Sequence, residues 1–495
     1  MKTSKISIAF MLVVLFTIGC SKELLDVPNA NDPTFEQVFS SGEDLETSAS
    51  GLYNIIFRGE HGFDGVQMML AVASDNVTCS WGNAGMRDFS NEPRKAWDNN
   101  PSYSNKTFPA FTWDQMYMAI GQATNIIRAL GNGVEVGPGG SGNKRVEAVA
   151  RFAMGVAYGN LALVFDKAFW VDETRTIEDA SLEKASDYNE IAAAAIGYLD
   201  QAVSLSSGFT IPAGWLGTEA DYSADDFKKL CNTMAARILS YTPRNKTENA
   251  AVDWNKVKTY ADNGITSDFA ILQDSYVKWY FEAGDYLTFY GWGATDMYTV
   301  NMMDPTQPQH WDDSPTFPYP PASVNPLDKR LETDFSYEPS IWFNPGRGYY
   351  HFTNYRFSKY DDIYVNADGP INDIAKAEND MLRAEARAYT GDLGGAAGII
   401  NTGTRKTRGQ MPDVAANLDD IVKAIHHERF VEMYVTGMGL QFFDMRKNDL
   451  LQKGTPLHLP VPSKILEALN MTPPFYTFGG VDKADGKNTS NAGWR

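Results

Sequence analysis

Aromatic and amide side chains, the residue types that bind sugar rings, gather in two stretches that lack helical periodicity, residues 74–109 and 269–364. A flat indole ring can cover the apolar face of a sugar, while amide, carboxylate and guanidinium groups form hydrogen bonds with its hydroxyl groups. We therefore expect these stretches to bind a ligand, with core packing as the alternative for each tryptophan. The residues singled out are Trp81, Asn83, Trp97, Trp279, Trp292 and Trp311.

The second stretch is unusual in composition. Phe, Trp and Tyr make up 24 of its 96 residues, or 25%, against 13% for the whole chain, and it holds nine prolines. A long irregular insertion in a helical scaffold is a common place for binding residues.

Catalytic and metal-binding motifs are incomplete. His427-Glu428 begins like a zinc-protease helix, but Val431 stands where the second histidine is required. Residues 137–144 imitate a phosphate-binding loop, yet Asn143 separates the last glycine from Lys144. Carboxylates are so numerous that a glycosidase-like pair stays possible but cannot be picked out. We predict no catalytic residue, no metal site and no cofactor.

Helical periodicity is strong on either side of the insertion, so the expected fold is all-α. Asp44 and Asp225 are candidate caps of two of these helices. The stretch 384–392 resembles one tetratricopeptide unit, in which small residues let paired helices approach and Tyr389 fills the groove. The predicted helices are 44–57, 112–130, 144–165, 188–205, 224–241, 373–389, 395–401 and 418–434.

The amino-terminal residues have the pattern of a bacterial lipoprotein signal. Lys2 and Lys5 precede an apolar run that is too short to span a bilayer, and Gly19 stands directly before Cys20. We expect residues 1–19 to be a signal peptide and Cys20 to be lipidated, so that acyl chains anchor residues 20–495. The alternative is an ordinary signal peptide with a coincidental cysteine.

The net charge limits the possible partners, and the cysteine content limits the possible disulfides. The formal net charge of −19 repels phosphate backbones, so we expect no nucleic-acid partner. Apart from Cys20 the chain has only Cys79 and Cys231, which favours two buried thiols over a disulfide but leaves the disulfide open.

The carboxy-terminal stretch 426–462 resembles the end of SusD/RagB-family proteins, which have a Glu-Arg-x-x-Glu helix, a glycine, an Asp-Leu-Arg-like turn and a Leu-Pro-Ile-Pro segment. On the helix, Glu428, Arg429 and Glu432 are spaced for ion pairing, which we favour over a catalytic role. Departures from the family pattern include Thr436 in place of a glutamate. The matching residues are Glu428-Arg429, Glu432-Met433, Gly437, Asp444-Met445-Arg446 and Leu459-Pro460-Val461-Pro462, with Leu382 to Ala386 and Ser74-Asp75 upstream.

The resemblance implies a tetratricopeptide-like scaffold with a long irregular insertion, exposed on the outer membrane through its lipid. It implies a binding protein rather than an enzyme, with a glycan ligand and a SusC-like TonB-dependent transporter as partners. A peptide or other cargo, or a surface α-helical glycoside hydrolase, are the alternatives. The ligand residues carried over are Trp81, Asn83, Arg87, Trp97, Trp279, Trp292 and Trp311.

Overall fold

Helices make up most of the described chain, and the strands are short and paired in twos. Residues from Ser41 to Arg495 form one compact unit. Cys20 and Trp81 lie outside the described residues, so their predicted roles stay predictions. The computed structural model describes residues 39–79, 82–175, 184–314, 320–340, 351–471 and 489–495.

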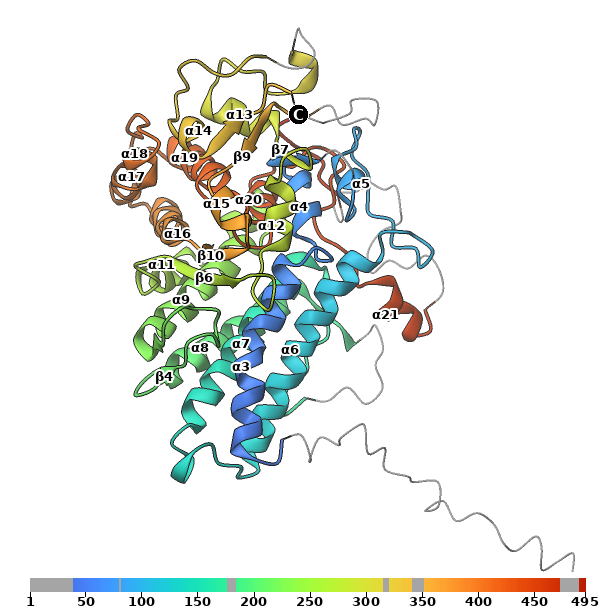
Figure 1. The fold of residues 1–495 in the computed structure, drawn as a ribbon, viewed down its shortest axis with the longest axis vertical. Helices are drawn as coiled ribbons and strands as arrows, with labels where there is room; N and C mark the ends of the chain where they lie inside the picture. The colour runs from blue at the N-terminus through green and yellow to red at the C-terminus, as the bar shows by residue number, and fades with distance from the viewer. Residues whose placement is uncertain (1–38, 80–81, 176–183, 315–319, 341–350, 472–488) are drawn as a thin grey trace, which may run out of the picture. The chain divides into compact units, whose positions relative to one another are not determined.

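The first group of helices is α3 (Gly42–His61), α6 (Thr107–Gly131), α7 (Asn143–Val164), α8 (Tyr188–Leu205), α9 (Ala224–Tyr241) and α11 (Trp254–Asp262). Consecutive members contact one another, and Figure 1 shows α3 and α6 lying side by side. The predicted bounds of α8 and α9 match the observed ones. Apolar residues at three- and four-residue steps give each helix a buried face, and α7 is buried along nearly its whole length.

The predicted helix caps are wrong in two places. Ser41 caps α3, and Asp44 is the third residue of the helix, whose carboxylate accepts a hydrogen bond from the Ser41 amide. Ser223 caps α9 in place of Asp225, because its hydroxyl accepts from the Asp226 amide. In both helices a serine caps the end and an acidic residue follows three positions later, and at α3 the two residues form the full reciprocal capping arrangement.

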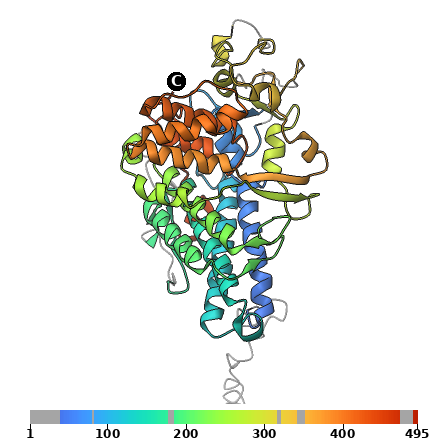
Figure 2. The same cartoon turned by 90° about the vertical axis from the view of Figure 1, so that its left-hand side faces the viewer.

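The second group of helices is α16 (Lys376–Tyr389), α17 (Leu393–Thr402), α19 (Leu418–Val431) and α20 (Leu440–Lys447). Helix α16 contacts α11, α17 and α19, so the two groups form one continuous stack, and Figure 2 shows the orange helices of this group above the green ones. Tyr389 stacks on Trp254 of α11, with ring centroids 4.5 Å apart. The predicted helical repeat scaffold is therefore confirmed, whereas the partner observed for Tyr389 is Trp254 of α11 rather than the paired helix α17.

Buried arginine–carboxylate pairs join helices that are far apart in sequence. Arg429 lies 2.5 Å from Asp444 and 2.6 Å from Glu385 of α16. Arg330 lies 2.7 Å from Glu428 and 3.0 Å from Glu432. The prediction that the α19 residues form ion pairs is confirmed, but their partners come from other segments, whereas the spacing alone suggested neighbours on the helix.

Arg446 bonds main-chain oxygens: its guanidinium donates to the Leu163, Tyr241 and Leu457 carbonyls at 2.8–2.9 Å. The motif that carries the family resemblance therefore holds the helices to one another.

The insertion is built from short elements between β6 (Phe269–Asp274) and its antiparallel partner β10 (Asp368–Ile374), which pair with Ile271 opposite Ile371. Strand β1 (Val77–Cys79) pairs with β7 (Gly293–Thr295) and so joins the early irregular stretch to the insertion. The remaining elements of the insertion are α12 (Glu282–Thr288), α13 (Met297–Met303), η4 (Trp311–Asp313), α14 (Arg330–Thr333), β8 (Phe335–Tyr337), β9 (Tyr355–Phe357) and α15 (Asp361–Tyr364).

Within the first group, Cys231 of α9 is a buried free thiol. In the described part of the chain, no helix combines the length and the apolar character needed to cross a membrane. The other short elements are α4 (Gln67–Ala73), α5 (Met86–Ser90), η2 (Pro138–Gly140), β2 (Lys167–Ala168), β3 (Ser186–Asp187), β4 (Thr210–Ile211), β5 (Tyr222–Ser223), α10 (Lys246–Ala250), α18 (Thr404–Thr407) and α21 (Ser463–Ala468).

Candidate ligand-binding site

Asn83 and Trp292, which are far apart in the sequence, lie on either side of Tyr286. The Asn83 amide donates a hydrogen bond of 2.8 Å to the Tyr286 hydroxyl. The Tyr286 ring packs against Trp292, with centroids 4.9 Å apart. The early irregular stretch and the insertion therefore contribute to one local surface, through two of the predicted ligand residues.

Trp292 presents an exposed ring directly before the first residue of β7. Its side chain is 44% exposed, and it also packs against the exposed Phe289 at 5.1 Å. Gly293 permits this placement, because a Cβ atom at that position would lie 1.8 Å from the Leu287 carbonyl oxygen. The close approach of β7 to α12 thus depends on glycine.

Tyr276 is held outward by the turn after β6. The Asp274 carboxylate accepts hydrogen bonds from the amides of Val277, Lys278 and Trp279 at 2.9–3.1 Å. Tyr276 has a φ of 69° and is 54% exposed, and its ring meets the Tyr280 ring edge-on at 4.7 Å. A non-glycine residue in the left-handed region costs free energy, which the Asp274 bonds offset.

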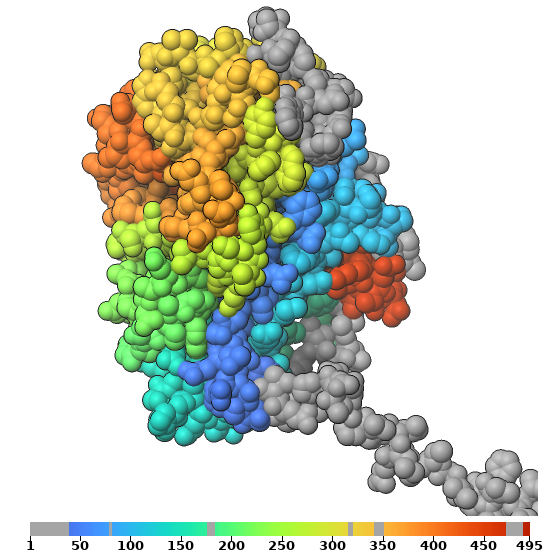
Figure 3. All heavy atoms as spheres, viewed as in Figure 1, coloured from blue at the N-terminus to red at the C-terminus, as the bar shows by residue number. Residues whose placement is uncertain are grey.

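Two depressions share Tyr276. The first has a volume of about 380 Å³ and is lined by residues of α3 and of the β6–α12 connection. The second, of about 330 Å³, is lined by α12, by the residues after it and by α15. Figure 3 shows this face, with the yellow-green atoms of the insertion running between the blue amino-terminal helix and the orange segment. We call the aromatic residues here the Tyr276 face: the exposed Tyr276, Phe289 and Trp292, and the partly buried Tyr290.

Charged groups surround the aromatic rings. Arg356 donates to both oxygens of Asp361 at 2.7 and 2.6 Å, and both residues line the second depression. Burial raises the pKa of Asp285 in the same depression, although the Tyr280 hydroxyl donates to it at 2.5 Å. The face combines flat apolar rings with hydrogen-bonding groups, which is the chemistry that a sugar ring requires.

Comparison of the whole fold with solved structures identifies its type. A SusD superfamily protein from Parabacteroides distasonis aligns with a TM-score of 0.61 and 14% identity, over 89% of this chain and 98% of that one. A SusD-like carbohydrate binding protein from Bacteroides fragilis aligns with a TM-score of 0.57 and 16% identity, over 83% and 86% of the two chains. The chain has the SusD-like fold.

A second SusD-like carbohydrate binding protein, from Bacteroides vulgatus, aligns at a TM-score of 0.56 with 16% identity, over 85% of each chain. By sequence alone, neither a family model nor a curated protein matches the chain. The SusD-like similarity is therefore one of three-dimensional structure, and it confirms the fold that the carboxy-terminal motif implied.

Within this SusD-like fold the other predicted ligand residues are dispersed. Trp97 and Trp279 are each 4% exposed, which fits the alternative of core packing. Trp97 packs against Phe89 and Tyr103, and Trp279 against Phe57 of α3. Trp311 is half-exposed in η4, and Arg87 is exposed in α5. Neither lines the two depressions that share Tyr276.

Sequence reasoning singled out tryptophans and missed Tyr276, Phe289 and Tyr290. The available signal was the clustering of aromatic residues, because eight of those in the insertion lie between residues 276 and 292. The outward direction of each ring is decided by tertiary contacts, such as the Asp274 turn, which the sequence pattern does not contain.

Groups of possible metal ligands also occur among the described residues. One is Glu60, His61 and Asp373 in the core, and the other is Glu92, His310 and His351. In the core group, His61 lies 2.8 Å from Asp373, which also accepts from the Tyr53 hydroxyl at 2.5 Å, and Asn160 donates to Glu60 at 2.6 Å. Hydrogen bonds within the protein thus occupy this group.

Proposed function

We propose that this protein is an outer-membrane lipoprotein, exposed at the cell surface, that binds a glycan and delivers it to a SusC-like TonB-dependent transporter. The observation that carries the proposal is the Tyr276 face, on a fold whose solved relatives include SusD-like carbohydrate binding proteins. The anchoring part of the proposal rests on the Gly19-Cys20 pattern and its apolar run.

The glycan would lie across the exposed rings. Trp292 and Phe289 offer adjacent apolar surfaces at 5.1 Å between centroids, and Tyr276 offers another beside the second depression. Arg356, Asp361 and Glu282 line the depressions and would bond the hydroxyl rim. Two shallow depressions around projecting rings suit a chain of sugar units better than a single small molecule.

The test is binding by a soluble form that starts at Ser21 and so retains the whole compact unit from Ser41. A panel of neutral polysaccharides and oligopeptides is screened, each hit is measured by calorimetry, and release of reducing ends is followed. Saturable glycan binding that Trp292→Ala and Tyr276→Ala weaken supports the proposal. The control is Leu418→Ala, which truncates an exposed apolar residue at the start of α19. Binding to peptides alone would keep the fold assignment and change the cargo.

A glycoside hydrolase is the second candidate, because Asp285 and Asp361 line the same depression beside exposed aromatic rings. Two carboxyl groups about 5–10 Å apart across the scissile bond are the pattern of a general acid and its partner, and burial raises the pKa of Asp285 as a general acid requires. However, the two oxygens of Asp361 are engaged by Arg356. Release of reducing ends that Asp285→Asn abolishes would establish the hydrolase and overturn the proposal of a binding protein.

A further inference from the structure

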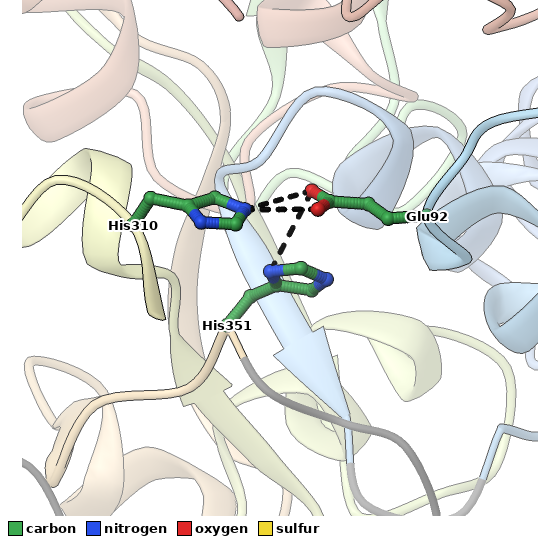
Figure 4. Close-up of side chains that lie close together, drawn as sticks. All are labelled: Glu92, His310 and His351. Carbon is green, nitrogen blue, oxygen red and sulfur yellow. Dashed lines mark hydrogen bonds and ion pairs between the residues drawn. The ribbon is translucent and has the colours of Figure 1, made fainter. Parts of the chain in front are cut away.

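Glu92, His310 and His351 come from three separate segments and converge on one point. Glu92 follows α5 in the early irregular stretch, His310 precedes η4, and His351 lies in the last part of the insertion. Figure 4 shows the two imidazole rings and the carboxylate facing one another. One potential ligand atom from each residue lies within 4.8 Å of the other two.

The distances suit a small cation. His310 Nε2 lies 2.9 and 3.0 Å from the two Glu92 oxygens, and His351 Nδ1 lies 3.8 Å from Glu92 Oε1. Ligands about 2.0–2.1 Å from a tetrahedral zinc ion are roughly 3.4 Å apart. The Glu92–His310 and Glu92–His351 separations lie on either side of this value, so small movements of the side chains would bring the carboxylate and each imidazole to ligating distance.

The His351 ring lies beside Glu92 without a hydrogen-bond partner among the described residues. Its side chain is only 7% exposed, and its ring forms no hydrogen bond with any of the described residues; 3.8 Å to Glu92 is too long for one. A cation between Glu92 and His351 would give this ring a partner. The core group of Glu60, His61 and Asp373 differs, because hydrogen bonds already occupy it.

His310 is oriented by a second carboxylate. Its Nδ1 lies 2.7 Å from Asp312, which in turn pairs with Arg495 at 2.5 Å. A metal-binding histidine commonly donates its other ring N–H to a carboxylate, which fixes the tautomer and aims the free nitrogen at the metal. The Glu92 side chain is 24% exposed, so an ion can reach the group from solvent.

We propose that Glu92, His310 and His351 bind one Zn²⁺ or a similar borderline divalent transition-metal ion. Two imidazoles and a carboxylate are the donors such ions favour, and three protein ligands leave a fourth position for water. The ion would tie the early irregular stretch to two points of the insertion. It would replace the hydrogen bond between His310 Nε2 and Glu92, and the proton of that bond would pass to solvent. This proposal is independent of the glycan.

The experiment is titration of Zn²⁺ into the tag-free soluble form starting at Ser21, after treatment with a chelator and with no glycan present. We expect one ion per chain. His351→Phe keeps a flat ring in the buried position, and Glu92→Gln keeps the shape of the carboxylate; both should lower affinity more than Asp312→Asn, for which a loss of about 10–100-fold is expected. The matched control, Glu332→Gln, removes an exposed carboxylate of α14 and should bind as the wild type does.

Absence of saturable binding to the wild type, or unchanged affinity in His351→Phe, overturns the proposal. Where a variant fails to fold, wild-type crystals soaked in Zn²⁺ decide the matter. An anomalous scattering peak between the three side chains supports the site, and a peak elsewhere or none at all refutes it.

Discussion

The Asn83 amide supports Tyr286 through a hydrogen bond of 2.8 Å, and Tyr286 in turn supports the exposed Trp292 ring. We predict that Asn83→Ala weakens glycan binding by about 0.5–1.5 kcal/mol, the usual net contribution of one hydrogen bond. Tyr286→Phe removes the same bond from the other side. Calorimetry on both variants and the double variant should therefore give less than additive losses, and additive losses would show that the bond does not matter for binding.

Trp292 and Trp279 provide a matched pair of tryptophans, one exposed and one buried. Trp292→Ala should weaken glycan binding by about 1–3 kcal/mol and leave the unfolding temperature nearly unchanged, because the ring packs only at the surface. Trp279→Ala should lower the free energy of unfolding by about 3–5 kcal/mol, since it leaves a cavity beside Phe57. Chemical unfolding and calorimetry on the same two variants would distinguish these effects, and a reversed result would place the binding face elsewhere.

Arg330 is fully buried among the carboxylates of Asp328, Glu428 and Glu432. Replacing it with Met removes the one guanidinium that these three buried carboxylates share and leaves them only their weaker outer partners, such as His427 at Asp328, so we predict a loss of about 3–5 kcal/mol in the free energy of unfolding. Urea unfolding measures this loss. The exposed pair of Lys406 and Asp413 is the control, and Lys406→Ala should change stability by less than about 0.5 kcal/mol. Equal losses would mean that burial of the Arg330 network contributes nothing.

Asp444 makes the fold sensitive to acid. Burial opposes its ionisation, but Arg429 and the hydrogen bond to His426 outweigh burial and hold the pKa of Asp444 well below its ordinary value of 3.8. The unfolded chain therefore binds this proton more readily than the folded one. The resulting stability is fully present above the unfolded pKa and is lost as pH falls through the folded pKa.

Urea unfolding at pH 6 and pH 3 tests this dependence. Asp444→Asn should be less stable than the wild type at pH 6 but should lose less stability between the two pH values. The comparison uses the change with pH rather than the absolute stability, because the substitution also leaves Arg429 less well paired. An unchanged pH dependence in the variant would assign the acid sensitivity to other carboxylates.

Local patterns in the sequence predicted the helices, because apolar periodicity and helix length are short-range properties. Helices α8 and α9 have the predicted bounds, and α16 and α17 form the predicted pair. The partners of Arg429 could not be predicted in this way. Glu385 and Asp444 are distant in sequence, and only the helix stack brings them to one guanidinium.

The candidate site lies in the segments that the sequence indicated, but only some of its residues were among those predicted. Aromatic enrichment located the insertion, and Asn83 and Trp292 do meet through Tyr286. Which rings face outward depends on features such as the positive φ of Tyr276 and the Gly293 contact with Leu287, which are tertiary. A preference for tryptophan over tyrosine therefore selected buried Trp97 and Trp279 and passed over Tyr276.

The four aromatic residues of the Tyr276 face belong to a single loop-and-helix segment, between β6 and β7, whereas the arginine cross-links belong to the helix stack and the last part of the insertion. The proposed binding surface thus lies in one continuous segment of the chain, which also contributes the buried Trp279 to the core. We expect that exchanging the segment between Asp274 and Gly293 for another sequence would change the ligand preference in one step. The helices joined by the buried arginine–carboxylate pairs would stay unaltered.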